Sequence, residues 1–229
     1  MEAVEASPTV DDKLTNMDNL ETLLENLDNA NDLTPLKLWT PLITLTTDPS
    51  ALIRASALSC LGTAIQNNPK AQEGFLTYNG VELVLTGLLK ETDASVVKKG
   101  VYCLSGFTQQ NPKAFDVMKE LGGWDFLLSL LAPNPHHAAI HKRLLHLFRS
   151  LVDQDDSGKI KMFLTAQKRI SARVLNIIRE SADVDTKEKG LELLSSLSGC
   201  FDDAEKKEIR DLVDQAKESG VGLEISRDS

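Results

Sequence analysis

The chain has 229 residues, of which 41% are hydrophobic and 5% aromatic, and its formal net charge is −9. This acidity argues against a nucleic-acid partner, because phosphate binding depends on concentrated lysine and arginine. No apolar run approaches the roughly 18 residues of a membrane span, and the N-terminus has no basic segment followed by an apolar one. The sequence therefore predicts a cytosolic protein, without a membrane span or secretory signal, whose partner is another protein.

The N-terminal segment is acidic and poor in apolar residues. Residues 1–32 hold nine acidic side chains and one basic side chain, and the composition of residues 1–15 predicts a disordered acidic segment. The helix expected next has leucines at three- and four-residue spacing, namely Leu20, Leu23, Leu24 and Leu27. We expect it to cap the elements that follow, with an exposed polar face that carries Glu21, Glu25 and Asp28.

A repeat then dominates the sequence. The stretch Gln66–Ala71 (QNNPKA) returns as Gln109–Ala114 (QQNPKA) after 43 residues, and Cys60 and Gly80 match Cys103 and Gly123 at the same offset. Periods of about 40–47 residues with helical apolar spacing are typical of armadillo and HEAT repeats, in which stacked helices bury a continuous core. The fit weakens towards the C-terminus, although Lys99-Gly100-Val101 resembles Lys189-Gly190-Leu191.

Each unit is expected to contain three helices. Four Xaa-Pro steps place a capping side chain before proline and are expected to start helices: Asp48-Pro49, Asn68-Pro69, Asn111-Pro112 and Asn134-Pro135. Gly80 and the pair Gly122-Gly123 supply tight corners between helices. Long inner helices are predicted near 49–66, 93–110, 135–152 and 184–200, short helices near 70–78 and 112–121, and outer helices near 81–90 and 124–131.

The remaining elements complete one elongated domain. A charged, glycine-containing loop at 153–158 precedes a helix expected at about 159–180, and a last helix at 203–218 closes the C-terminal end. We predict an all-α fold, an armadillo-like right-handed α-solenoid of about four repeats with capping helices, that occupies residues 16–218. A flexible tail is expected at 219–229.

The sequence lacks the motifs of catalysis and of cofactor binding. It has no phosphate-binding glycine loop, no Cys-x-x-Cys and no zinc-binding His-Glu-x-x-His, so we expect no cofactor, no metal and no enzymatic activity. His137 and His141 stand one helical turn apart and could share a metal, but a third ligand is not evident. The three cysteines, Cys60, Cys103 and Cys200, are interpreted as reduced core residues.

Basic residues on the inner helices form the candidate binding site. They are Arg54, Lys98, Lys99, Lys142, Arg143 and Arg149. Stacked repeats would bring such positions into adjacent rows, and Tyr102 would lie one turn from Lys98 as a rigid contact with a polar tip. The set favours an acidic protein partner, whereas any single charge could instead solvate a helix face or pair with a neighbouring carboxylate.

Several runs resemble the cytosolic armadillo-type nucleotide-exchange factors of heat-shock protein 70 (Hsp70). They are Asn19–Glu21, Glu25–Leu33, Leu36–Trp39, Gly62–Pro69 and Lys70–Gln72. The similarity covers roughly residues 16–200. It implies a monomer whose hollow face grips one lobe of the chaperone's nucleotide-binding domain and displaces the other lobe, so that bound ADP escapes.

The resemblance also implies contact residues. It points to the turn that contains Ala30 and Asn31, and to a basic position at either Lys142 or Arg143. On this basis Ala30→Arg should abolish exchange without unfolding the protein. The resemblance also implies a longer flexible N-terminal extension that helps to detach client from the chaperone, whereas about fifteen residues precede the first expected helix here. Either this sequence is trimmed or client release is weakened.

Three alternatives remain. A general armadillo scaffold would hold an extended peptide with Trp and Asn ladders, but the corresponding places hold Ser59, Tyr102 and Leu145, then Thr63, Gly106 and Arg149. The endoplasmic-reticulum relative of the same family would perform exchange on a luminal chaperone, although no signal sequence is visible. An enzyme is the third alternative, and no nucleophile, base and orienting group stand at motif spacing.

Overall fold

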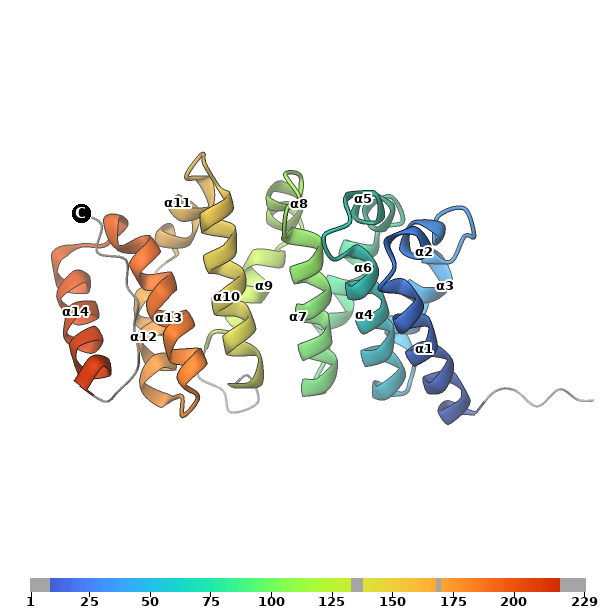
Figure 1. Ribbon diagram of the computed structural model, residues 1–229, viewed down its shortest axis with the longest axis horizontal. Helices are drawn as coiled ribbons and strands as arrows, with labels where there is room; N and C mark the ends of the chain where they lie inside the picture. Colours follow the sequence, from blue (N-terminus) through green and yellow to red (C-terminus); the bar gives the residue numbers. More distant parts are fainter. Residues whose placement is uncertain (1–8, 133–137, 168–169, 219–229) are drawn as a thin grey trace, which may run out of the picture. The chain divides into compact units, whose positions relative to one another are not determined.

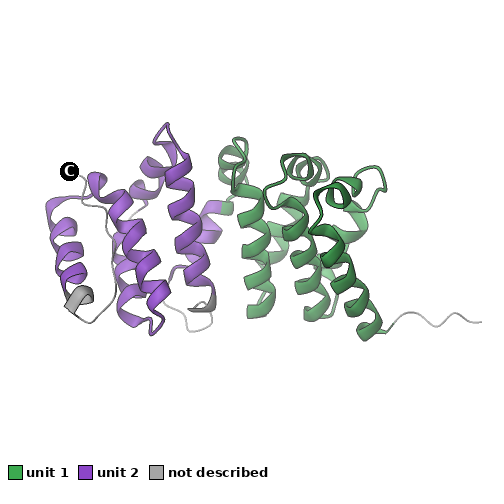
Figure 2. Ribbon diagram, viewed as in Figure 1, with its two compact units in different colours: residues 1–123 green, residues 124–229 purple. Residues whose placement is uncertain are grey.

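The computed structural model describes residues 9–132, 138–167 and 170–218. All regular secondary structure in this part of the chain is helical (Figure 1). The chain divides into two compact units, residues 1–123 and residues 124–229 (Figure 2). The predicted all-α class is therefore confirmed, and the single armadillo-repeat domain at 16–218 stays a prediction. The predicted tail at 219–229 lies outside the described residues.

The first unit repeats a pattern of two short helices followed by one long helix. α4 packs against both α1 and α7, so these three helices form one row (Figure 1). The helices are α1 (Val10–Leu24), α2 (Leu27–Asp32), α3 (Trp39–Thr44), the 3-10 helix η1 (Leu45–Thr47), α4 (Ala51–Ile65), α5 (Pro69–Thr77), α6 (Gly80–Leu88), α7 (Ala94–Thr108) and α8 (Ala114–Glu120).

The second unit has the same helical character. α13 packs against both α10 and α12. Its elements are α9 (Gly123–Ser129), which begins at the unit boundary, α10 (Ala138–Gln154), α11 (Lys159–Ala166), α12 (Ile170–Glu180), α13 (Val184–Leu197), the 3-10 helix η3 (Ser198–Cys200) and α14 (Asp203–Glu218). The single helix expected at 159–180 is thus two helices, α11 and α12.

Glycines at repeated positions allow the helices to turn sharply. A Cβ added to Gly80 would lie 2.2 Å from the Phe75 ring, and one added to Gly123 would lie 2.6 Å from the Met118 side chain. The residue before each glycine is left-handed, with φ of 56° at Asn79 and 71° at Gly122. The predicted corners are confirmed, and in the first of them asparagine adopts the left-handed conformation that glycine adopts in the second.

Glycines inside the long helices allow close packing on the preceding helix. A Cβ on Gly100 of α7 would lie 2.4 Å from Leu88 of α6, and one on Gly190 of α13 would lie 2.6 Å from Ile178 of α12. The glycine in each of the Lys-Gly-apolar steps at 99–101 and 189–191 therefore serves the same purpose, which is close contact with the preceding helix.

The core of the first unit is centred on aromatic rings. Trp39, Phe75 and Phe107 are fully buried. Ring centroids lie 6.0 Å apart for Trp39–Phe75 and 6.2 Å apart for Phe75–Phe107, which joins α3, α5 and α7. Such tilted and edge-on contacts add to the stabilisation from burial of the rings.

Helix α1 starts earlier than its composition predicts. Thr9 and Asp12 form a capping box, in which the Thr9 hydroxyl accepts from Asp12 N and the Asp12 carboxylate accepts from Thr9 N. Residues 10–15, expected to be disordered, are consequently helical. Residues 1–8 lie outside the described residues.

Only one Xaa-Pro step among the described residues starts a helix as predicted. Asn68 caps α5, with Pro69 as its first residue. Asp48 instead accepts from Ser50 N, and α4 begins at Ala51. Asn111 accepts from Lys113 N, and α8 begins at Ala114. Both side chains form tight Asx-type turns before the helix rather than capping it. Asn134-Pro135 lies outside the described residues.

Candidate functional site

A row of polar side chains crosses α1, α4 and α7 in the first unit. Glu21 Oε1 accepts hydrogen bonds from Ser59 Oγ (2.5 Å) and Thr63 Oγ1 (3.1 Å). Lys99 Nζ donates to Ser59 Oγ (2.7 Å), and the Tyr102 hydroxyl lies 3.2 Å from Thr63 Oγ1. We call these five residues the polar row. It links three helices that are distant in sequence, and it ends in a cation and an aromatic ring.

Tyr102 is held by the shape of α4 as well as by hydrogen bonds. A Cβ on Gly62 would lie 2.6 Å from two carbons of the Tyr102 ring, so the ring occupies the space that this glycine leaves. The Tyr102 hydroxyl also donates to Gln66 Oε1 (3.1 Å). Lys99 Nζ lies 5.9 Å from the ring centroid, which is within range of a cation–π interaction.

The polar row modifies the sequence prediction in two ways. Lys98 was expected beside Tyr102, but Lys98 is exposed and Lys99 is the residue over the ring. Glu21 was assigned to an outward polar face, whereas its carboxylate binds α4. A sequence signal for the row exists: Ser59 and Thr63 are polar residues one turn apart in the largely apolar second half of α4.

Arg54 is part of an ion pair between successive repeats. Its Nε lies 2.7 Å from Glu91 Oε2 and its Nη2 lies 3.0 Å from Glu91 Oε1. Arg54 Nη1 donates to the carbonyl oxygens of Asp48 (3.0 Å) and Pro49 (3.1 Å). The hydrogen bond to Glu91 raises the pKa of Arg54, and the Arg54 guanidinium lowers the pKa of Glu91. Arg54 therefore holds the repeats together, with its charge compensated.

The candidate cations of the second unit are on α10. Lys142 pairs with Asp185 of α13, and this hydrogen bond raises the pKa of Lys142. Arg149 pairs with Asp153 one turn along the same helix. Arg143 is exposed. Lys142 and Arg149 therefore follow the alternative given for single charges, because each pairs with a neighbouring carboxylate.

Ala30 and Asn31 lie in the short helix α2. Ala30 is 1% exposed, so its side chain faces the protein interior, and this burial argues against the expectation that Ala30→Arg leaves the fold intact. A guanidinium would have to enter a packed site. Asn31 is half-buried, and its Oδ1 atom is buried without a hydrogen-bond donor in the described part of the chain.

The histidines and cysteines provide no metal site among the residues that the structure describes. His141 is buried, with Nε2 3.2 Å from the Leu130 carbonyl oxygen, while His136 and His137 lie outside the described residues. Cys60 and Cys103 are buried, as predicted, and burial raises the pKa of the Cys60 thiol to about 12. Cys200 is exposed, which corrects its assignment to the core.

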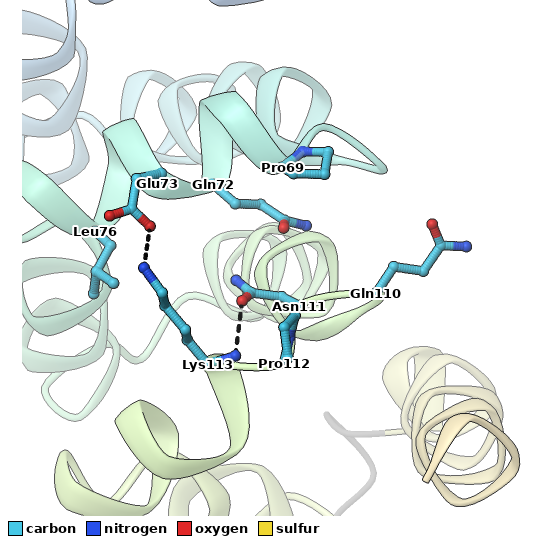
Figure 3. Close-up of a pocket in the computed structure, with 8 residues that line it drawn as sticks. All are labelled: Pro69, Gln72, Glu73, Leu76, Gln110, Asn111, Pro112 and Lys113. Carbon is cyan, nitrogen blue, oxygen red and sulfur yellow. Dashed lines mark hydrogen bonds and ion pairs between the residues drawn. The ribbon is translucent and has the colours of Figure 1, made fainter. Parts of the chain in front are cut away.

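A pocket of about 190 Å³ lies between α5 and the second copy of the repeated hexapeptide (Figure 3). Leu76 and the prolines Pro69 and Pro112 contribute apolar walls. The ion pair between Glu73 Oε2 and Lys113 Nζ (2.8 Å) crosses from α5 to the segment before α8.

No helix in the described ranges is long and apolar enough to span a bilayer.

The amino-acid sequence of this chain matches a family of known proteins. Residues 29–173 match the family described as "SIL1/FES1/HPBP1 C-terminal domain", and residues 1–33 match "Nucleotide exchange factor Fes1". The chain is 32% identical over 212 residues to the Hsp70 nucleotide exchange factor FES1 of Eremothecium gossypii, a match that covers 88% of the chain and 72% of the relative.

Two further matches concern the length of a relative and the fold of the chain. The FES1 protein of Mycosarcoma maydis is 38% identical over 157 residues, which cover 68% of this chain but 39% of the relative. The chain thus spans less than half the length of that protein. A designed armadillo repeat protein solved with the peptide (KR)4 has a TM-score of 0.73 at 13% identity, covering 96% of this chain and 90% of the design. The armadillo-like fold is confirmed, and the chain belongs to the Fes1 family.

Proposed function

We propose that this chain is an Hsp70 nucleotide exchange factor that binds the chaperone's nucleotide-binding domain and accelerates the release of ADP. The observation that carries the proposal is the family match over residues 29–173, together with 32% identity to a FES1 exchange factor across 88% of the chain. On the resemblance to cytosolic exchange factors, we also propose that it acts as a monomer in the cytosol.

The proposed activity needs no covalent step. An exchange factor must bind the open, nucleotide-poor form of the chaperone more tightly than the closed form, because a ligand shifts a conformational equilibrium only through its differential affinity. Linkage requires the reverse effect as well, so ADP must weaken binding of this chain to the chaperone by the same factor.

We propose that the polar row supplies contacts to the chaperone from the first unit. Lys99 and Tyr102 are fixed before binding, which lowers the cost of ordering them in a complex. Lys98 is exposed beside them on α7. Among the other sequence candidates, Lys142, Arg143 and Arg149 of α10 and Asn31 of α2 stay proposed contacts. Arg54 is proposed to act on stability, because its guanidinium is committed to Glu91.

The direct test is the release of fluorescent ADP from the purified Hsp70 nucleotide-binding domain, chased with excess unlabelled nucleotide. The full chain should raise the release rate in proportion to its concentration until binding saturates. A matched Lys98→Glu, Tyr102→Ala variant should require higher concentrations for the same rate. A release rate that the wild-type chain leaves unchanged would refute the proposed function.

A further inference from the structure

The polar row has one member that can only accept hydrogen bonds, the carboxylate of Glu21. Its Oε1 lies 2.5 Å from Ser59 Oγ and 3.1 Å from Thr63 Oγ1. Because a carboxylate offers no proton, each hydroxyl must donate its single proton to Glu21. The oxygen of each hydroxyl is then left as an acceptor for a group on α7.

Lys99 depends on this orientation of Ser59. The Lys99 ammonium donates to Ser59 Oγ at 2.7 Å, and it can do so because the serine proton points to Glu21. Without Glu21, a helical serine readily turns to donate to the carbonyl oxygen four residues earlier in its own helix. Lys99 would then keep the contact of 5.9 Å with the Tyr102 ring centroid but lose its hydrogen-bonded support.

Tyr102 depends on Thr63 in the same way. Thr63 donates its proton to Glu21, so in the 3.2 Å contact between the two hydroxyls Thr63 can only accept, and the single Tyr102 proton is shared between Thr63 Oγ1 and Gln66 Oε1 (3.1 Å). Gly62 fixes the position of the ring, and the hydroxyl bond fixes the direction of its polar tip. Lys99 and Tyr102 of α7 therefore both contact α4 hydroxyls whose protons are directed to Glu21 of α1.

We propose that Glu21 is a positioning residue for partner binding, which acts through Ser59 and Thr63 to hold Lys99 and Tyr102 in one arrangement. This inference rests on the proposed function, since the partner is the Hsp70 nucleotide-binding domain. Pre-ordering two side chains is expected to strengthen binding by about tenfold. Neither the composition of α1 nor the family match assigns this role to Glu21.

The positioning of Lys99 can be measured without the chaperone. Brief acetylation with acetic anhydride, followed by peptide mass spectrometry, compares Lys99 with its neighbour Lys98, which is exposed on the same helix. In the wild-type chain Lys99 should react several-fold more slowly than Lys98. Glu21→Ala should raise the rate at Lys99 towards that at Lys98, and Glu21→Gln, which retains an acceptor oxygen, should keep Lys99 protected.

Binding to the nucleotide-free Hsp70 nucleotide-binding domain is measured with the same variants. Glu21→Ala should weaken binding about tenfold, Glu21→Gln should restore most of the affinity, and Glu25→Ala should match the wild type. Glu25 is the control because it is exposed and lies one turn further along the chain. In a Lys99→Met, Tyr102→Leu background, Glu21→Ala should have no further effect, which a general loss of stability would not produce.

The outcomes separate the two proposals. If the wild-type chain binds but Glu21→Ala binds as well as Glu25→Ala, or if acetylation of Lys99 does not change, the positioning role is overturned. Additive losses in the Lys99→Met, Tyr102→Leu background would overturn it as well. If the wild-type chain does not bind the chaperone, the proposed function fails. The acetylation rate of Lys99 still decides whether Glu21 positions the Lys99 side chain.

Discussion

The ion pair between Arg54 and Glu91 provides a sharp test of what holds successive repeats together. Glu91 Oε1 accepts from Arg54 Nη2 and from the backbone nitrogens of Thr92 and Asp93, both at 2.9 Å, while Oε2 accepts from Arg54 Nε. Replacing Glu91 with glutamine puts an NH₂ group in place of one of these oxygens. In either orientation of the amide, its NH₂ group then lies against an N–H donor of Arg54, Thr92 or Asp93.

The structure indicates the size of the effect. The side chains of Glu91 and Arg54 are 9% and 20% exposed, so solvent compensates little for the loss. One charge-assisted hydrogen bond and the neutralisation of Arg54 disappear together, and we expect Glu91→Gln to lower the free energy of unfolding by about 2 kcal/mol. Glu73 pairs with Lys113 but is 58% exposed, so Glu73→Gln should cost less than about 0.5 kcal/mol.

Urea unfolding followed by circular dichroism compares the two variants, with hydrogen exchange reporting on α4 and α7. The pH dependence adds a second check. Arg54 lowers the pKa of Glu91 in the folded state, so the pair's stabilisation is full above the ordinary glutamate pKa and is lost as the pH falls through the lowered value. The difference between wild type and Glu91→Gln should therefore shrink in acid. Equal losses for both variants at neutral pH would refute the reasoning.

Three further predictions concern packing and reactivity. Gly100→Ala should lower the free energy of unfolding by about 1–3 kcal/mol, because its Cβ would lie 2.4 Å from Leu88. Gly87→Ala in α6 is the control, since its Cβ would have no atom within 4 Å. In the same urea titration this variant should be neutral or stabilising by up to about 1 kcal/mol. Ala30→Arg should cost at least about 3 kcal/mol, and a thermal unfolding midpoint equal to that of the wild type would contradict the burial of Ala30. Thiol labelling of the native chain should modify Cys200 rapidly and leave Cys60 and Cys103 unmodified until the protein unfolds, since burial raises the pKa of both buried thiols.

The repeat allowed much of the fold to be predicted from the sequence. The offset of 43 residues located the long helices α4, α7, α10 and α13 to within a few residues, and it identified Gly80 and Gly123 as corners. The short helices near 70–78, 81–90, 112–121 and 124–131 were also predicted, whereas α2 and α3 were missed because tertiary packing determines them. α2 and α3 have six residues each, and α3 is held by burial of Trp39 rather than by helix propensity.

The candidate site was harder to predict, because charge pairing depends on which helices are neighbours. Arg54 and Glu91 are 37 residues apart, and Lys142 and Asp185 are 43 apart. The sequence identified the cations but not the carboxylates that compensate them. Opposite charges separated by about one repeat length are the signal that would have found both pairs. The role of Glu21 required the structure, because the hydroxyls that donate to it lie on α4 and the side chains that contact those hydroxyls lie on α7.

The central claim is that this chain favours the nucleotide-free form of Hsp70. Titration of the chain against the nucleotide-binding domain, with and without saturating ADP, measures this preference directly. ADP should weaken binding of the chain, and the chain should weaken ADP binding by the same factor. Equal affinity for the ADP-bound and nucleotide-free domains would contradict it.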